Sequence, residues 1–98
     1  NVKRQNNKVY EIVIKGHAGY DEAGKDIVCA AVSSMAICTV NGIIRLDDSI
    51  DYEENSGLLK IRVLKDTEIN NKLLDNLVEL LSELVIQYPE NIEIRNED

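Results

Sequence analysis

The sequence predicts a single α+β domain in which a small sheet is accompanied by two helices. The chain has 98 residues, which is near the lower limit for one self-sufficient core. Runs of strand length with β-branched or alternating residues flank two longer stretches of helical character, in the order ββαββαβ. Hydrophobic residues at 44% and charged residues at 30% are globular proportions. We therefore expect residues 1–98 to form one domain, with any active site inside that fold or between copies of it.

The first predicted elements are a hairpin and a long loop. Residues 9–14 are β-branched and aromatic enough for a strand, and residues 5–8 have the composition of a turn that leads back to a short strand over residues 1–4. From Gly16 to Lys25 the chain contains three glycines and no apolar periodicity. Loops of this length in a small domain usually have a function.

A long apolar helix is predicted from Asp26 to about Asn41. Aspartate is a preferred N-cap residue because its carboxylate accepts the unpaired N–H groups of the first helical turn. No charged residue occurs between Asp26 and Arg45, and apolar or small residues lie on every side, so we expect this helix to be buried. One sheet covers only one side of a helix. The other side needs a second helix or a second subunit.

The second half of the chain predicts a hairpin, a helix and a last strand. Residues 49–53 and 58–63 alternate, with turn-forming residues between them. Apolar residues from Ile69 to Tyr88 then recur at helical spacing opposite polar ones, which predicts an amphipathic helix that Pro89 ends. Residues 92–94 have the alternation of a short closing strand.

Charge and composition argue against several classes of partner. The formal net charge of −7 repels phosphate backbones, so we expect no direct nucleic-acid partner. No run approaches the eighteen or so uninterrupted apolar residues of a membrane span, and residues 1–7 lack the apolar core of a signal peptide. These features predict a cytoplasmic protein without a membrane partner. Two cysteines do not make a disulfide framework.

The residues that carry chemistry are one histidine and one of the cysteines. His17 is the only histidine, and with two cysteines it falls short of a structural zinc site, while no nucleotide-binding motif occurs. We therefore expect neither a metal nor a cofactor. Cys29 follows the loop and would be the third helical residue, where the helix dipole and unpaired N–H groups favour a thiolate and stabilise an oxyanion. His17 would take the thiol proton. Asp26 has two open roles, as helix cap or as a third residue that orients His17.

Two further residues of the same helix have alternative readings. Cys38 is predicted about 180° around the helix from Cys29 and some 13 Å along it, so the two thiols do not share a site. We expect Cys38 to be a buried thiol that acts as a small hydrophobe, a role that Cys29 would share without the glycine loop and His17 before it. Ser33 lies one turn after Cys29 and either contacts substrate or bonds back to a helix carbonyl.

These residues resemble the signature of a known family. Gly16-His17-Ala18, followed by GKDIVCAAVS over residues 24–33, is similar to the motif of the ribosomal-processing cysteine protease family Prp. The order and length of the predicted elements also match this family over nearly the whole chain. The resemblance implies that Cys29 is the nucleophile and His17 the base. It implies supporting or substrate-binding roles for Asp26, Ser33, Gly16 and Gly24.

The resemblance also implies a substrate and an assembly. A member of this family would be a homodimeric peptidase that removes the N-terminal extension of a basic large-subunit ribosomal protein, by cutting after a phenylalanine. The alternative is a non-catalytic module of the ribosome or of its assembly, in which Cys29 is structural. A thiol redox sensor comes third, because no resolving cysteine is within reach.

Overall fold

The structure, a computed structural model, describes residues 1–16, 23–55 and 57–97, with side chains in the first helix from residue 27 onward. The elements in chain order are β1 (Val2–Gln5), β2 (Lys8–Lys15), α1 (Ala23–Leu46), β3 (Ile50–Asn55), β4 (Leu58–Val63), α2 (Glu68–Gln87) and β5 (Asn96–Glu97). This order confirms the predicted α+β fold.

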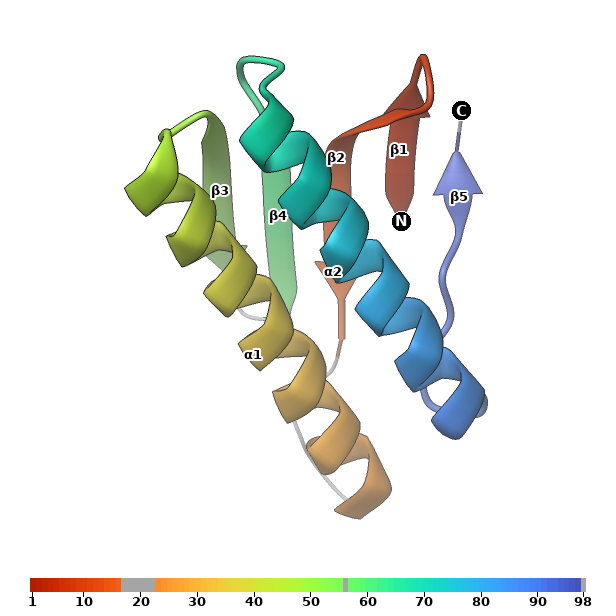
Figure 1. The fold of residues 1–98 in the computed structure, drawn as a ribbon. Coiled ribbons are helices and arrows are strands. Elements are labelled where there is room, and N and C mark those ends of the chain that lie inside the picture. Colours follow the sequence, from red (N-terminus) through yellow and green to blue (C-terminus); the bar gives the residue numbers. More distant parts are fainter. Residues whose placement is uncertain (17–22, 56, 98) are drawn as a thin grey trace.

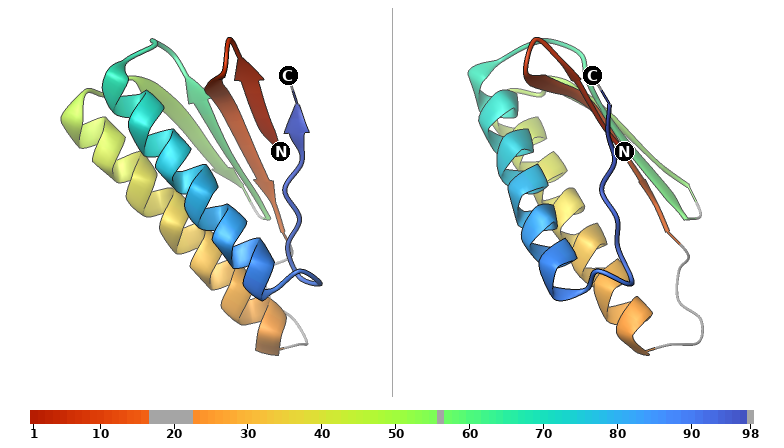
Figure 2. Two further views of the ribbon diagram at one scale, coloured as in Figure 1. Left: turned by 45° about the vertical axis from the view of Figure 1, so that its right-hand side comes forward. Right: turned by 90° about the vertical axis from the view of Figure 1, so that its right-hand side faces the viewer.

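The fold has two layers, a five-stranded sheet and a pair of helices (Figure 1). The strand order is β3-β4-β2-β1-β5, and neighbours are antiparallel except for β1 and β5, which are parallel. Both helices lie on the same face of the sheet, which leaves the other face open (Figure 2). The core therefore lies between the inner face of the sheet and one stripe on each helix.

The two predicted hairpins are confirmed. Between β1 and β2 the chain turns at Asn6 and Asn7, with φ of 55° and 64°, as a type I′ turn requires. Asparagine tolerates these left-handed angles better than most residues. In the second hairpin, Asn55 pairs with Leu58 in the last rung before the turn.

The last strand lies three to four residues later than the sequence predicts. β5 comprises Asn96 and Glu97, which pair with Val2 and Lys3 of β1. Residues 92–94 were expected to form the strand because they alternate, but Ile92 and Ile94 instead pack against the core without pairing. Alternation reports which side chains are buried, whereas a strand also needs a neighbouring strand edge.

The first helix is longer and more exposed than predicted. It extends from Ala23 to Leu46, and its buried residues form a single stripe of small and branched side chains: Val28, Val32, Ala36, Val40 and Ile43. The prediction of a helix buried on every side is therefore wrong for the single chain. On its outer side Ile27 is 59% exposed and Ile44 is 39% exposed. Neither the sheet nor α2 covers this outer side.

The residues Ile27–Leu46 of α1 are also long and apolar enough to cross a membrane, by length and composition alone, with a mean hydropathy of 2.0. By this measure of length and composition, the expectation that the chain holds no segment long and apolar enough to span a membrane is wrong. The buried stripe on the sheet and on α2 accounts for part of this hydropathy, because the core helix of a small α+β domain has the same character.

The second helix begins at a polar network. Thr67 is its N-cap, and the Thr67 hydroxyl accepts a hydrogen bond of 3.1 Å from the backbone N–H of Asn70. The fully buried Asn70 amide donates to the Ser49 hydroxyl at 2.8 Å and to the Lys65 carbonyl at 2.7 Å. This network connects the end of the α1–β3 connection to the start of α2.

Candidate active site

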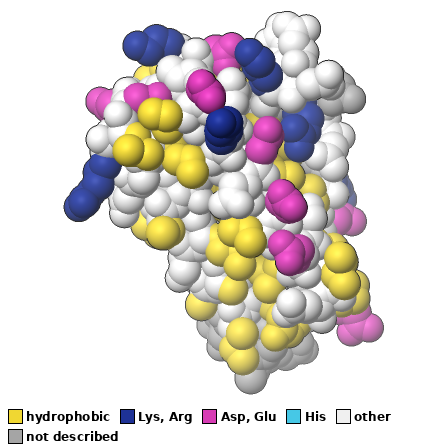
Figure 3. All heavy atoms as spheres, in the orientation of Figure 1, with side chains coloured by type: hydrophobic (Ala, Val, Ile, Leu, Met, Phe, Trp, Pro, Cys, Tyr) yellow, Lys and Arg dark blue, Asp and Glu magenta, His cyan; other side chains and the backbone are white. Residues whose placement is uncertain are grey.

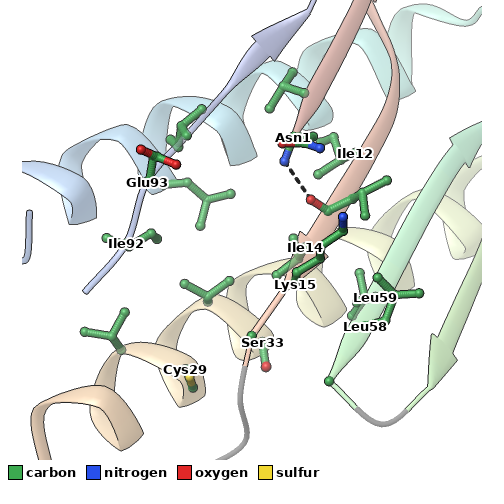
Figure 4. Close-up of a pocket in the computed structure, with 18 of the residues that line it drawn as sticks. Asn1, Ile12, Ile14, Lys15, Cys29, Ser33, Leu58, Leu59, Ile92 and Glu93 are labelled. Carbon is green, nitrogen blue, oxygen red and sulfur yellow. Dashed lines mark hydrogen bonds between the residues drawn. The ribbon is translucent and has the colours of Figure 1, made fainter. Parts of the chain in front are cut away.

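A cleft of about 670 Å³ opens where the sheet and the helices diverge. Its walls come from the end of β2, the N-terminal half of α1, the tip of the β3–β4 hairpin and the segment that follows α2 (Figure 4). Apolar side chains line much of it, and they include Ile12, Ile14, Val28, Val32, Leu81, Ile92 and Ile94. Such a mixture of apolar walls and a few polar groups is typical of a site that binds an organic ligand or a peptide.

Cys29 lines this cleft, as does Ser33 one turn further along the same helix. The Cys29 side chain is half-buried, and no disulfide joins it to Cys38. Gly16, at the end of β2, lies next to it, since a methyl group built on Gly16 would be 3.8 Å from the Cys29 Sγ. The structure thus brings three of the candidate site residues, Gly16, Cys29 and Ser33, to one cleft.

The helix begins three residues earlier than predicted, which changes two expectations. Asp26 is the fourth residue of α1, so its predicted position as the N-cap is wrong. Cys29 is the seventh residue, in the second turn rather than the first. The effect of the helix dipole falls off within the first turn, and the unpaired N–H groups also belong to that turn. The helix N-terminus therefore supplies much less thiolate or oxyanion stabilisation at Cys29 than we expected.

Of the remaining candidate residues, Cys38 differs from its prediction, and several others lie outside the part of the chain that the structure describes. Cys38 is exposed, so the expectation of a buried thiol is wrong. His17 and the loop after it lie outside the described residues, as does the side chain of Asp26. Gly24 is the second residue of α1, in the part of the helix for which only the backbone is described.

Two parts of the cleft wall were not predicted from the sequence, the segment after α2 and the tip of the β3–β4 hairpin. Ile92 and Ile94 form part of its wall after α2, although their alternation suggested only a strand. Gly57, at the tip of the β3–β4 hairpin, faces Gly16 across a hydrogen bond of 3.0 Å from the Gly16 N–H to the Gly57 carbonyl. The glycine in a turn was visible in the sequence, but its approach to Gly16 depends on the register between β2 and β4.

The described part of the chain holds no group of three or more His, Cys, Asp or Glu side chains placed to bind a metal ion. The described lining of the cleft does include a half-buried thiol, that of Cys29. A thiol in a cleft of this kind attacks carbonyl carbon when a nearby base removes its proton.

Comparison with known proteins decides the family. A family model described as "Cysteine protease Prp" matches residues 1–93. The chain belongs to the Prp family of cysteine proteases. A relative from Staphylococcus aureus, named ribosomal processing cysteine protease Prp, is 34% identical over 91 residues, which cover 89% of this chain and 86% of the relative. The Prp of Mycoplasma genitalium is also 34% identical, over 88% of this chain and 87% of its own length.

Solved structures of similar proteins have the same fold. The Staphylococcus aureus Prp protease in complex with a covalently linked product peptide superposes with a TM-score of 0.83 at 30% identity, over 98% of this chain and 95% of that one. SMU.848 from Streptococcus mutans gives a TM-score of 0.84 at 29% identity, over 98% and 90%. The protein is thus a cysteine protease, and the alternative of a non-catalytic module is not supported.

Proposed function

We propose that this Prp protease removes the N-terminal extension of a large-subunit ribosomal protein, with Cys29 as the nucleophile and His17 as the general base. The observation that carries the proposal is the position of Cys29 on the wall of the 670 Å³ cleft, in a chain that belongs to a cysteine protease family. Of the two cysteines, only Cys29 lines this cleft.

The proposed reaction proceeds in two stages. His17 removes the thiol proton, and the Cys29 sulfur forms a bond to the carbonyl carbon of the scissile peptide. When the carbon–nitrogen bond breaks, the His17 imidazolium gives its proton to the leaving amine, and a thioester remains on Cys29. Water then attacks the thioester with His17 again as base, which releases the carboxylate product and restores the thiol.

Two features support a peptide from a ribosomal protein as the substrate. Relatives at 34% identity are named ribosomal processing proteases, and crystal structures of the Staphylococcus aureus Prp hold a substrate peptide and a covalently linked product peptide. The net charge of −7 is compatible with this substrate, because an acidic enzyme attracts a basic ribosomal protein before specific contacts form. We place the reaction in the cytoplasm, where these proteins are synthesised.

We also propose a homodimer that uses the outer side of α1. The exposed positions of this side recur at helical spacing and are apolar or small: Ile27, Ala30, Ser34, Cys38, Asn41 and Ile44. Figure 3 shows hydrophobic side chains along the helical face of the molecule. A second copy is the occupant that best matches such an uncharged helix face, because an isologous contact would pair it with an equally apolar surface.

Cleavage of a synthetic peptide that spans the ribosomal extension tests the proposed function. We expect the wild-type protein to cut this peptide at one bond and Cys29→Ala to leave it intact, as mass spectrometry would show. Cys38→Ala is the matched control and should cut at the wild-type rate, because Cys38 lies outside the cleft. Equal rates for Cys29→Ala and wild type would rule out Cys29 as the nucleophile. Cutting of a scrambled peptide at the same rate would rule out the substrate.

A further inference from the structure

The tip of the β3–β4 hairpin meets the end of β2 immediately before His17. The last paired rung between β2 and β4 joins Lys15 and Leu58. One residue further, the backbone N–H of Gly16 donates a hydrogen bond of 3.0 Å to the carbonyl of Gly57. The hairpin tip therefore holds the backbone of Gly16, which is bonded directly to the residue that we propose as the base.

Only glycine fits at position 57. Its φ of +76° lies in the left-handed region, where side chains with a Cβ are strained. A Cβ built on Gly57 would also lie 2.8 Å from the carbonyl oxygen of Gly16. This atom belongs to the backbone, so no side-chain rotation relieves the contact. Any L-residue at position 57 must push Gly16 away or shift the hairpin.

Gly16 in turn lies against the thiol. A methyl group built on Gly16 would contact the Cys29 Sγ at 3.8 Å, an ordinary van der Waals distance. A shift of Gly16 therefore changes two things together, the packing beside the sulfur and the position of the strand end to which His17 is bonded. Displacements of about 1 Å in a catalytic arrangement cost up to about 100-fold in rate.

We propose that Gly57 is a positioning residue: it allows the hairpin tip to approach the backbone of Gly16, and so fixes Gly16 beside the Cys29 thiol. The proposal rests on the proposed function, because Gly16 borders the proposed nucleophile and is bonded to the residue that we propose as the base. Among the described residues, a Cβ built on Gly57 meets only Gly16 within 4 Å, so Gly57 would act through Gly16.

The chain provides a matched control. Gly42 lies in α1, and a Cβ built on it meets nothing within 4 Å. Gly42→Ala therefore adds the same methyl group without a contact, and in a helix this exchange generally stabilises the protein. Of two variants at the tip, Gly57→Ala introduces both the contact with Gly16 and the strain. Gly57→Asn keeps the contact with less strain, because asparagine tolerates positive φ.

The experiment measures catalysis and thiol reactivity for each variant in a Cys38→Ala background. The readouts are kcat and KM on the extension peptide, the rate of Cys29 alkylation by iodoacetamide from pH 5 to pH 9, and the folded fraction by circular dichroism. We expect both Gly57 variants to lose about 10- to 100-fold in kcat, with a smaller change in KM. Their alkylation profile should move toward that of His17→Ala. Gly42→Ala should match the background protein in every readout.

Three outcomes would overturn the proposal in different ways. If Gly57→Asn keeps kcat and the alkylation profile while His17→Ala loses both, Gly57 has no positioning role and the proposed function stands. A loss of rate that only follows the loss of folded protein, with an unchanged alkylation profile, makes Gly57 merely structural. If His17→Ala itself changes neither readout, the His17–Cys29 pair fails, and the positioning role fails with it.

Discussion

The two cysteines of α1 have different surroundings. Cys29 is half-buried on the wall of the cleft, beside Gly16, whereas Cys38 is exposed on the outer side of the helix. Exposure alone would make Cys38 the faster thiol with an alkylating reagent. Activation by a neighbouring base acts in the opposite direction, because only the thiolate is a nucleophile.

We expect iodoacetamide at pH 7 to modify Cys29 faster than Cys38 in the native monomer, which Ile44→Glu favours and in which no second copy covers Cys38. Peptide mapping of protein quenched at successive times gives both rates from one sample. In 6 M guanidinium chloride the two rates should become similar, since the fold no longer distinguishes the thiols. Faster labelling of Cys38 in the native protein would show that exposure, and not activation, governs these thiols.

The exposure of Cys38 could not be predicted from the sequence. α1 carries no charged residue between Asp26 and Arg45, so no polar face shows which side is turned outward. By contrast, the clustering of Gly16, Cys29 and Ser33 was predictable, since a strand end and two residues one helical turn apart flank the same loop. The helix dipole at Cys29 was overestimated because Asp26 looked like a cap, although the helix begins at Ala23.

At the scale of elements, a buried asparagine connects the start of α2 to the rest of the fold. The Asn70 amide donates to Ser49 and to the carbonyl of Lys65, while its own Oδ1 has no hydrogen-bond partner among the described residues. Asn70 lies on the buried side of an otherwise leucine-rich helix. When it is removed, Ser49 and the Lys65 carbonyl lose the hydrogen bonds that they accept from it, so the contact is specific to this residue.

We expect Asn70→Ala to lower the free energy of unfolding by about 2 kcal/mol, because a buried acceptor loses its donor. Asn76→Ala, at an exposed position of the same helix, is the matched control and should change it by less than about 0.5 kcal/mol. Urea unfolding followed by circular dichroism measures both. Equal stability of the two variants would mean that the network adds nothing to the folded state.

The open face of the sheet carries an ion cluster around Glu11. Its carboxylate lies 3.0 Å from Lys3, 3.6 Å from Lys60 and 3.8 Å from Arg62, on strands β1 and β4 at either side of β2. The hydrogen bond from Lys3, with smaller contributions from the nearby positive charges, lowers the pKa of Glu11, although desolvation opposes this shift.

A pKa that is lower in the folded state than in the unfolded chain stabilises the fold above the ordinary value of 4.5. This contribution is lost as the pH falls through the native value. We expect Glu11→Gln to be less stable than wild type by about 1 kcal/mol at pH 7, with the difference narrowing below pH 4.5. Thermal unfolding at pH 7, 5 and 3 tests this. A difference that grows in acid would contradict the sign of the shift.

The order of the helices and strands was predictable from the sequence, but the position of the last strand was not. Turn residues and hydrophobic periodicity gave both hairpins and the amphipathic α2. Residues 92–94 looked like a strand, yet the strand edge of β1 is available only to Asn96 and Glu97, which pair with Val2 and Lys3. Such long-range pairing is not encoded in local alternation.

At the scale of the whole molecule, an acidic domain exposes one uncharged helix face. Ile27 and Ile44 are 59% and 39% exposed on this face, while the core on the opposite side of α1 is fully formed. An exposed apolar surface of this kind lowers solubility unless another molecule covers it.

We expect the protein to be a dimer by light scattering coupled to size exclusion, and Ile44→Glu to shift it toward the monomer. The two new charges would face each other or an apolar surface in an isologous contact. Leu64→Glu is the control, because Leu64 is 64% exposed and lies outside α1. A wild-type monomer at all concentrations up to 100 μM, or a dimer that Ile44→Glu leaves intact, would exclude this face as the interface.

The central claim is that His17 and Cys29 act as one catalytic unit, and a double-mutant cycle tests it most directly. The measurement is kcat/KM on the extension peptide for wild type, His17→Ala, Cys29→Ala and the double variant, with folding checked by circular dichroism. If the residues act together, His17→Ala costs about 100-fold or more, Cys29→Ala leaves only a small residual rate at high enzyme concentration, and the double variant is no slower than Cys29→Ala. A folded His17→Ala that cleaves at the wild-type rate, or a double variant slower than Cys29→Ala by the full His17 factor, would contradict the claim.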